Sequence, residues 1–238
     1  NGKKTFLKSI EYNIDKPEVK NIEVSEFDGN SFRVKVEGLD SNSAVKTVKI
    51  PVWSTMNGQD DLIWYDTKKD EFGNYYTDID IKDHKYDIGK YNIHVYIEDV
   101  TGGNSFGGQI EKNIELKYGK FYVVSKDSKN YSIILSGVKV PDGTQVVKFP
   151  IWSKKNGQDD LKWYTATKND EGSWQADITI DDHMHLGEYY AHAYAVFPNG
   201  NNQFITSTTF ITQEPVVNNV MTSVTDRKNG KIKVVISE

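Results

Sequence analysis

Residues 50–65 read IPVWSTMNGQDDLIWY, and residues 149–164 read FPIWSKKNGQDDLKWY. Most positions of the two stretches are identical, and each matching pair is 99 positions apart. A constant offset between two copies indicates internal duplication, which decides the architecture before any single residue is interpreted. The recurring residues are Pro51, Trp53, Asn57, Gly58, Gln59, Asp60, Asp61, Leu62, Trp64 and Tyr65, matched by Pro150, Trp152, Asn156, Gly157, Gln158, Asp159, Asp160, Leu161, Trp163 and Tyr164.

The length of 238 residues is compatible with one large or two ordinary domains, and the period of 99 favours two. About a hundred residues suffice for an independent hydrophobic core. Hydrophobic residues make up 37% of the chain, with 14 Tyr, 10 Phe and 5 Trp. This aromatic content excludes a disordered chain.

Composition narrows the possible partners and chemistry. The net charge is −5 and no Lys/Arg cluster stands out, so we expect no nucleic-acid partner. The chain has no cysteine, which excludes a disulfide scaffold, metal–thiolate sites and cysteine nucleophiles. No apolar run approaches the ~18 residues of a membrane span. We predict no cofactor.

The repeats extend beyond two complete copies. Residues near the N-terminus match residues 198 positions later in the chain, which is twice the period. We therefore predict that 1–15 is the last strand of a preceding repeat, that 16–116 and 117–213 are complete repeats, and that 214–238 holds the first strands of a following one. With no signal peptide visible, we expect a fragment of a longer array. The matching residues are Asn1, Gly2, Phe6 and Pro17 with Asn199, Gly200, Phe204 and Pro215.

Within a repeat, short alternating segments predict only β-strands. The first copy contains FRVKVEG, VKTVKIPVW, LIWYDT, YYTDIDI, YNIHVYIED and IEKNIEL, separated by Gly, Asn, Asp and Pro turns. About seven short strands in roughly a hundred residues is typical of an immunoglobulin-like sandwich. We therefore predict an all-β chain of two tandem immunoglobulin-like β-sandwich repeats, with partial repeats at both ends.

A second motif supports the sandwich. Residues 87–93, DIGKYNI, have the spacing of a tyrosine corner, in which a tyrosine hydroxyl bonds a nearby backbone carbonyl. The second copy keeps Gly187 and Tyr189 but lacks the aspartate and one loop residue. We predict that Tyr91 and Tyr189 are structural.

Strand alternation assigns faces to the repeated stretch. Lys49, Pro51 and Trp53 share one face, and lysine belongs outside, so Trp53 is predicted to face solvent. In the next strand position 63 is Ile in one copy and Lys in the other. This variability predicts Leu62 and Trp64 inward and Tyr65 outward.

The outward residues of three strands form a predicted aromatic platform. Aromatic rings with polar tips suit the faces of sugar rings. Two other interpretations of Trp53 remain open: a bulge at Pro51 that turns it into the core, or a contact with the next repeat. The candidate ligand-binding residues are Trp53, Tyr65, His94 and Tyr96, repeated as Trp152, Tyr164, His192 and Tyr194.

The N-G-Q-D-D loop allows three interpretations. Asn-Gly favours a tight turn because both central residues of a type I′ turn need φ > 0. The aspartates are weak candidates for a calcium site, since Ca²⁺ takes oxygen ligands. Paired carboxylates also serve in glycosidases, but adjacent aspartates in a strand point to opposite faces. We favour the hydrogen-bonded turn, predict no catalytic residue, and keep Asp60, Asp61, Asp159 and Asp160 as the calcium candidates.

His84 and His183 sit in a polar connection, and His185 follows in the second copy alone. Two histidines two residues apart can ligate a metal, but no third ligand recurs in both copies. A hydrogen bond that fixes the turn is the favoured interpretation. No phosphate-binding glycine loop, G-x-S-x-G or H-E-x-x-H motif occurs.

The run P-x-W-S-x-x-NGQDDL-x-WY, followed by KDH or DDH and then by G-x-Y-x-x-H-x-Y, resembles the group B streptococcal Bsp-like repeat family. The resemblance covers both complete copies. It implies tandem extracellular modules of Gram-positive surface proteins and cell-wall lytic enzymes. It supplies no catalytic residues.

These observations predict a non-enzymatic accessory region of an extracellular cell-wall or surface protein. Its partners would be cell-wall glycan or peptidoglycan and the adjacent repeats of the same chain, with a separate hydrolase domain in the parent protein. The alternative is a mechanical spacer or adhesin stalk in which Trp53 and Trp152 are buried. A third interpretation lets residues 1–14 and 216–238 complement each other between molecules.

Overall fold

The structure, a computed structural model, describes residues 2–11, 18–39, 45–144, 146–212, 219–226, 229 and 231–237. The chain divides into two compact units, Asn1–Leu116 with Val140–Asp142 and Lys117–Lys139 with Gly143–Glu238. Strands dominate both, and the helical turns among the described residues are two short 3-10 helices. None of the described helices is long and apolar enough to cross a membrane. The predicted all-β fold is confirmed.

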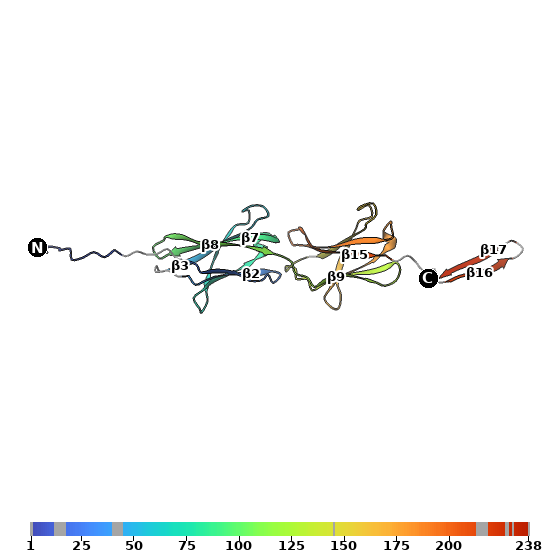
Figure 1. The fold of residues 1–238 in the computed structure, drawn as a ribbon, viewed down its shortest axis with the longest axis horizontal. Helices are drawn as coiled ribbons and strands as arrows, with labels where there is room; N and C mark the ends of the chain where they lie inside the picture. The colour runs from blue at the N-terminus through green and yellow to red at the C-terminus, as the bar shows by residue number, and fades with distance from the viewer. Residues whose placement is uncertain are drawn as a thin grey trace. The chain divides into compact units, whose positions relative to one another are not determined.

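The first unit is a sandwich of two antiparallel sheets. One sheet has the strand order β1-β2-β6-β5 and the other β4-β3-β7-β8. Figure 1 shows β7 and β8 in one layer and β2 in the other. The elements are β1 (Asn21–Val24), β2 (Ser31–Glu37), β3 (Val45–Ser54), β4 (Ile63–Asp66), β5 (Lys68–Lys69), β6 (Tyr75–Asp80), the 3-10 helix η1 (Ile81–His84), β7 (Gly89–Asp99) and β8 (Asn104–Ile114).

The second unit repeats this order. Its strands run β15-β14-β11-β12-β13-β10-β9, because the single strand β12 pairs with β11 in one layer and with β13 in the other. In the first unit two strands make these pairings: β4 pairs with β3 in one layer, and β5 pairs with β6 in the other. The elements are β9 (Lys120–Ser125), β10 (Asn130–Ser136), β11 (Val146–Ser153), β12 (Lys162–Lys168), β13 (Trp174–Thr179), η2 (Ile180–Asp182), β14 (Glu188–Val196) and β15 (Asn202–Ile211).

Each core lies between the two layers and is filled by alternate residues of the strands. In β7 the odd-numbered positions from Tyr91 to Ile97 are buried, and the even-numbered ones are partly exposed. The predicted tyrosine corner is confirmed, because the Tyr91 hydroxyl donates to the Asp87 carbonyl at 2.8 Å and Tyr189 donates to the carbonyl of His185.

The two cores place their larger and smaller side chains on different strands. Ile97 of the first unit is matched by Ala195 in the second, and Gly107 is matched by Ile205. A Cβ at Gly107 would lie 2.9 Å from Val19 Cγ2 and 3.1 Å from Ile97 Cδ1. Gly107 therefore makes room for the larger side chains of β7, and the alanines of β14 make room for Ile205.

The ends of the chain differ from the two sandwiches. Residues 2–11 form no strand, whereas β16 (Asn219–Asp226) and β17 (Lys231–Ser237) pair as an antiparallel hairpin. Residues 12–17 and 213–218 lie outside the described part of the chain. The assignment of both ends to neighbouring repeats, and their pairing between molecules, stay predictions.

Candidate functional site

The outer face of the β4-β3-β7-β8 sheet carries the aromatic side chains. Trp64 is directly opposite Pro51 in the register, and Tyr65 is opposite Ile50. Opposed residues of an antiparallel pair share a face. Trp64 therefore lies on the outer face, and Tyr65 on the inner face with the core residue Ile50. The predicted orientations of both residues are wrong.

The wrong face assignment came from position 63, which is Ile in one copy and Lys in the other. Ile63 is opposite Val52, and its counterpart Lys162 is opposite Ile151, so both lie on the inner side, in a stretch of strand that pairs on one side only. At an edge a lysine can still reach water, and Lys162 Nζ lies 3.3 Å from Asp182. A lysine at this position is therefore compatible with an inner orientation.

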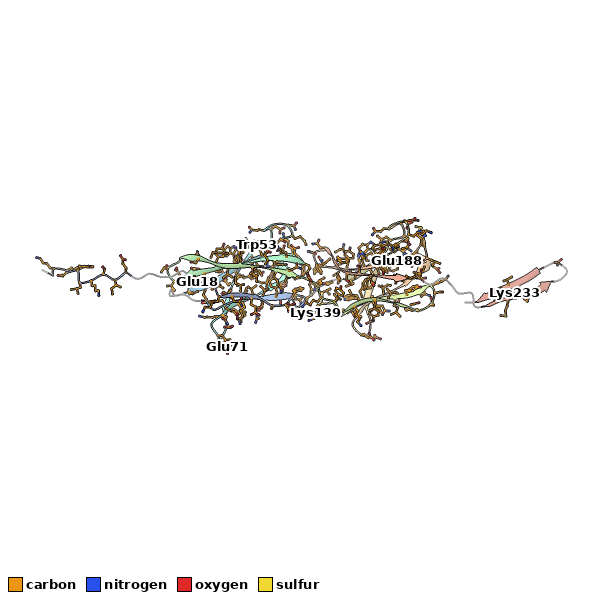
Figure 2. All side chains as sticks on the ribbon, in the orientation of Figure 1. Glu18, Trp53, Glu71, Lys139, Glu188 and Lys233 are labelled. Atoms are coloured by element: carbon orange, nitrogen blue, oxygen red, sulfur yellow. The ribbon has the colours of Figure 1, made fainter. Side chains whose placement is uncertain are left out.

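Trp53 lies on the outer face, as alternation predicts, but its side chain is only 9% exposed. Its ring centroid is 4.8 Å from that of His94. The register of β3 is continuous through Pro51, so no bulge turns Trp53 inward. Figure 2 places Trp53 in one layer and Glu71 at the tip of a loop on the opposite side of the unit. The expected solvent exposure of Trp53 is wrong.

The exposed rings on this outer face of the first unit are Trp64 and Phe106, each 53% exposed. Tyr96 lies between them, with ring centroids 5.1 Å from Trp64 and 5.5 Å from Phe106. His94 connects Phe106, at 5.6 Å, to the buried Trp53. We call Trp53, Trp64, His94, Tyr96 and Phe106 the first aromatic face.

The second unit reproduces this arrangement. Trp163 is 50% exposed and Phe204 44%. The Tyr194 ring lies 5.5 Å from each of them, and Phe204 lies 5.4 Å from His192. Trp152 is 9% exposed, like Trp53, and lies 4.7 Å from His192. The second aromatic face comprises Trp152, Trp163, His192, Tyr194 and Phe204.

Sequence analysis missed Trp64 and Phe106 as surface residues. The offset of 98 that relates His94 to His192 also relates Phe106 to Phe204. The structure explains this match, because Phe106 is opposite Tyr96 and Phe204 opposite Tyr194. Applying the offset to the last strand of the repeat would have identified the phenylalanine.

Tyr65 belongs to a buried polar cluster. Its hydroxyl lies 2.8 Å from Nε2 of the fully buried His84, whose Nδ1 lies 3.1 Å from Asp61 Oδ2. A carboxylate only accepts, so Nδ1 carries the proton, and in the neutral ring Nε2 accepts from the tyrosine. Burial, reinforced by the charges of Asp83 and Asp80, raises the pKa of Tyr65 above its ordinary value of 10.0.

The second unit contains the same cluster with one change. Tyr164 lies 3.0 Å from His183 Nε2, but His183 Nδ1 donates to the Asp160 backbone carbonyl at 3.1 Å. Among the described residues, Asp160 Oδ2 is buried without a hydrogen-bond partner. Burial lowers the pKa of His183, and the charge of Asp160 opposes this effect only in part.

The predicted calcium residues have other partners. The backbone amide of Ser54 donates to both oxygens of Asp61 at 3.1 Å, whereas Asp60 pairs with Lys85 at 2.6 Å. In the second unit Ser153 donates to Asp160 Oδ1 at 2.9 Å. The described residues contain no group of three or more His, Cys, Asp or Glu arranged to hold a metal ion. Asp61 closes the loop between β3 and β4, which matches the favoured hydrogen-bonded turn.

The histidine that occurs in the second unit alone stays near the surface. His185 Nε2 lies 3.4 Å from both Asp159 Oδ2 and Asn156 Nδ2. These distances are at the long limit of hydrogen bonding, so the contacts are weak.

The comparison with protein families matches the GBS Bsp-like repeat twice, at residues 21–111 and 121–210. The chain belongs to the GBS Bsp-like repeat family. Each match begins in or directly beside the first strand of a sandwich and ends in its last strand, so one Bsp-like repeat is one sandwich. No curated protein matches the chain.

Solved structures similar to the Bsp-like repeats share little sequence with them. A segment of two fibronectin type III domains from chicken tenascin has 10% identity and a TM-score of 0.42, covering 84% of this chain and all of its own. The tetra-tandem repeat in the extending region of a large adhesion protein has 14% identity, a TM-score of 0.31, and coverage of 93% and 61%. A polysaccharide deacetylase from Bacillus cereus has 16% identity and a TM-score of 0.33, and the match covers 42% of this chain and 31% of the deacetylase.

Proposed function

We propose that the chain is a non-catalytic region of an extracellular Gram-positive surface protein that binds cell-wall glycan through its two aromatic faces. The observation that carries the proposal is the recurrence of one arrangement of rings in both repeats. In each, an exposed tryptophan and an exposed phenylalanine flank a tyrosine at centroid distances of 5.1–5.5 Å. Exposed clustered apolar surface is typical of contact sites.

The chemistry of this face favours a sugar over a purely apolar partner. Trp64, Tyr96 and His94 combine ring surface with hydrogen-bonding groups at the ring edges. Such groups can bond the hydroxyls of a sugar whose ring lies on the tryptophan. Lys49 and Asp66 form an ion pair beside Tyr96, which adds polar partners at the border of the rings.

The proposal gives each candidate a specific role. Trp64 and Trp163 supply the exposed contact surface, with Tyr96, Phe106, Tyr194 and Phe204 beside them. Trp53 and Trp152, at 9% exposure, support the rings from below. Tyr65 and Tyr164 are assigned to the buried clusters and not to the ligand.

The test is sedimentation of the chain with purified cell walls. We expect the wild type to sediment, and Trp64→Ala combined with Trp163→Ala to weaken binding by roughly tenfold or more. Phe72→Ala is the matched control, because Phe72 is 80% exposed but lies in the loop between β5 and β6. A wild type that stays in the supernatant contradicts the proposal.

A mechanical spacer is the second candidate, and the burial of Trp53 and Trp152 favours it, since that interpretation expects both to be buried. The two functions differ in what the exposed tryptophans do. A spacer predicts that removal of Trp64 and Trp163 changes no interaction of the chain. The sedimentation experiment separates the two candidates directly.

A further inference from the structure

The two aromatic faces differ in charge although their rings match. In the first repeat Lys49 is opposite Asp66 in the register and pairs with it. In the second repeat Lys148 occupies the place of Lys49, but Thr165 occupies the place of Asp66. Within the described residues, Lys148 has no carboxylate partner. The second face therefore carries a cation that the first face neutralises.

The surrounding charges are paired on both faces, so among the described residues Lys148 accounts for the difference. On the first face Glu98 pairs with Lys46 and Glu111 pairs with Lys90, each at 2.6 Å. The corresponding residues of the second repeat, Val196 and Thr209, are uncharged. On the second face Glu188, in the place of Lys90, pairs with Lys154 at 2.6 Å. Its charge is thus already balanced.

Lys148 is also placed next to the rings. It is directly opposite Tyr194, whose ring contacts both Trp163 and Phe204. The residue is half-buried, which is typical of a lysine whose aliphatic part is covered while its ammonium group stays in water. An ammonium group beside an aromatic surface is complementary to a sugar ring that bears a negative substituent.

We propose that the second aromatic face binds an anionic saccharide, with Lys148 holding its carboxylate or phosphate while the sugar ring lies on Trp163 and Tyr194. The first face, whose charges are paired, takes a neutral saccharide. This inference rests on the proposed function, because it assigns a ligand class to the same site. The second face is specific for an anion because Thr165 takes the place that Asp66 has on the first face.

The experiment uses the full chain in which the exposed tryptophan of one face is replaced. Trp64→Ala leaves the second face as the binding site, and Trp163→Ala leaves the first. Three probes are titrated by calorimetry: a neutral N-acetylglucosamine oligomer, a peptide-free glycan with N-acetylmuramic acid carboxylates, and a glycosylated polyglycerol phosphate. The last two distinguish a carboxylate from a phosphate as the anionic group.

We expect the Trp64→Ala chain to bind one of the anionic probes more tightly than the neutral oligomer. Adding Lys148→Met weakens that binding roughly fivefold and changes neutral binding less than about twofold. Thr165→Asp, which creates the ion pair of the first face, has the same effect. Asp66→Thr in the Trp163→Ala chain gains a preference for the anion. The preferences diminish with added salt.

Equal affinity of the Trp64→Ala chain for neutral and anionic probes overturns the inference and leaves glycan binding intact. An equal loss for all probes with Lys148→Met also overturns it, because the lysine then acts without regard to charge. If the wild type binds none of the three probes, the proposed function fails together with the inference.

Discussion

Tyr65→Phe tests the buried cluster, because it removes one hydroxyl and retains the ring. The hydroxyl lies 2.8 Å from His84 Nε2, and the His84 side chain has no solvent exposure. The substitution leaves a buried ring nitrogen without a partner, which costs about 1–3 kcal/mol. For a repeat of about 100 residues, 2 kcal/mol lowers the melting temperature by roughly 10 °C.

The assay is hydrogen exchange of the full chain, resolved by peptide mass spectrometry. The free energy of opening of the first repeat should fall by about 2 kcal/mol, and the second repeat serves as the internal reference. Trp64→Ala is the neighbouring control, and we expect a loss of about 1 kcal/mol or less because the side chain is 53% exposed. An unchanged opening free energy in Tyr65→Phe, or a loss of glycan binding without a loss of stability, would refute the buried assignment of Tyr65.

Three further predictions follow from the packing and the buried histidines. Burial lowers the pKa of His183 in the folded state, so the unfolded state binds the proton first and the second repeat should lose stability as pH falls below about 6.5. Denaturation of the wild type and of His183→Phe at pH 7.5 and 5.5 measures this loss. A gain in stability of the wild type on acidification contradicts the prediction. Gly107→Ala should destabilise the first repeat by about 1–3 kcal/mol, Ile97→Ala alone should also destabilise it, and the double variant should lose less than the sum of the two in a denaturant titration; fully additive losses would exclude packing of Ile97 against position 107. Tyr91→Phe should cost about 1 kcal/mol by the same method through the lost bond to the Asp87 carbonyl, and an unchanged midpoint would argue against the tyrosine corner.

The sequence predicts the fold well because its signals are local or repeated. Duplication, the turns that separate short alternating segments and the spacing around Tyr91 are all readable without tertiary contacts. They predict the strands, the sandwich and the corner that the structure contains. The outer face of β7 is also predicted correctly, because eleven residues of regular alternation leave one consistent assignment.

The errors concern features that depend on pairing between strands. The strand β4 has only four residues, and a one-residue shift in its assignment exchanges Trp64 and Tyr65 between the faces. The register between β3 and β4 decides which face each residue occupies, and local sequence patterns do not specify that register. The cluster of Asp61, Tyr65 and His84 joins positions 19 and 23 residues apart, so it emerges only from the folded chain.

Glycan binding by the aromatic faces requires that the ligand contacts the exposed tryptophan of each face. The direct measurement is the indole N–H spectrum of the ¹⁵N-labelled chain during titration with wall-derived glycan. Of the five tryptophans, we predict that Trp64 and Trp163 shift most, Trp53 and Trp152 shift less, and Trp174, in the other layer on β13, does not shift. Shifts confined to Trp174, or no shift of Trp64 and Trp163 at saturating glycan, would exclude binding through the aromatic faces.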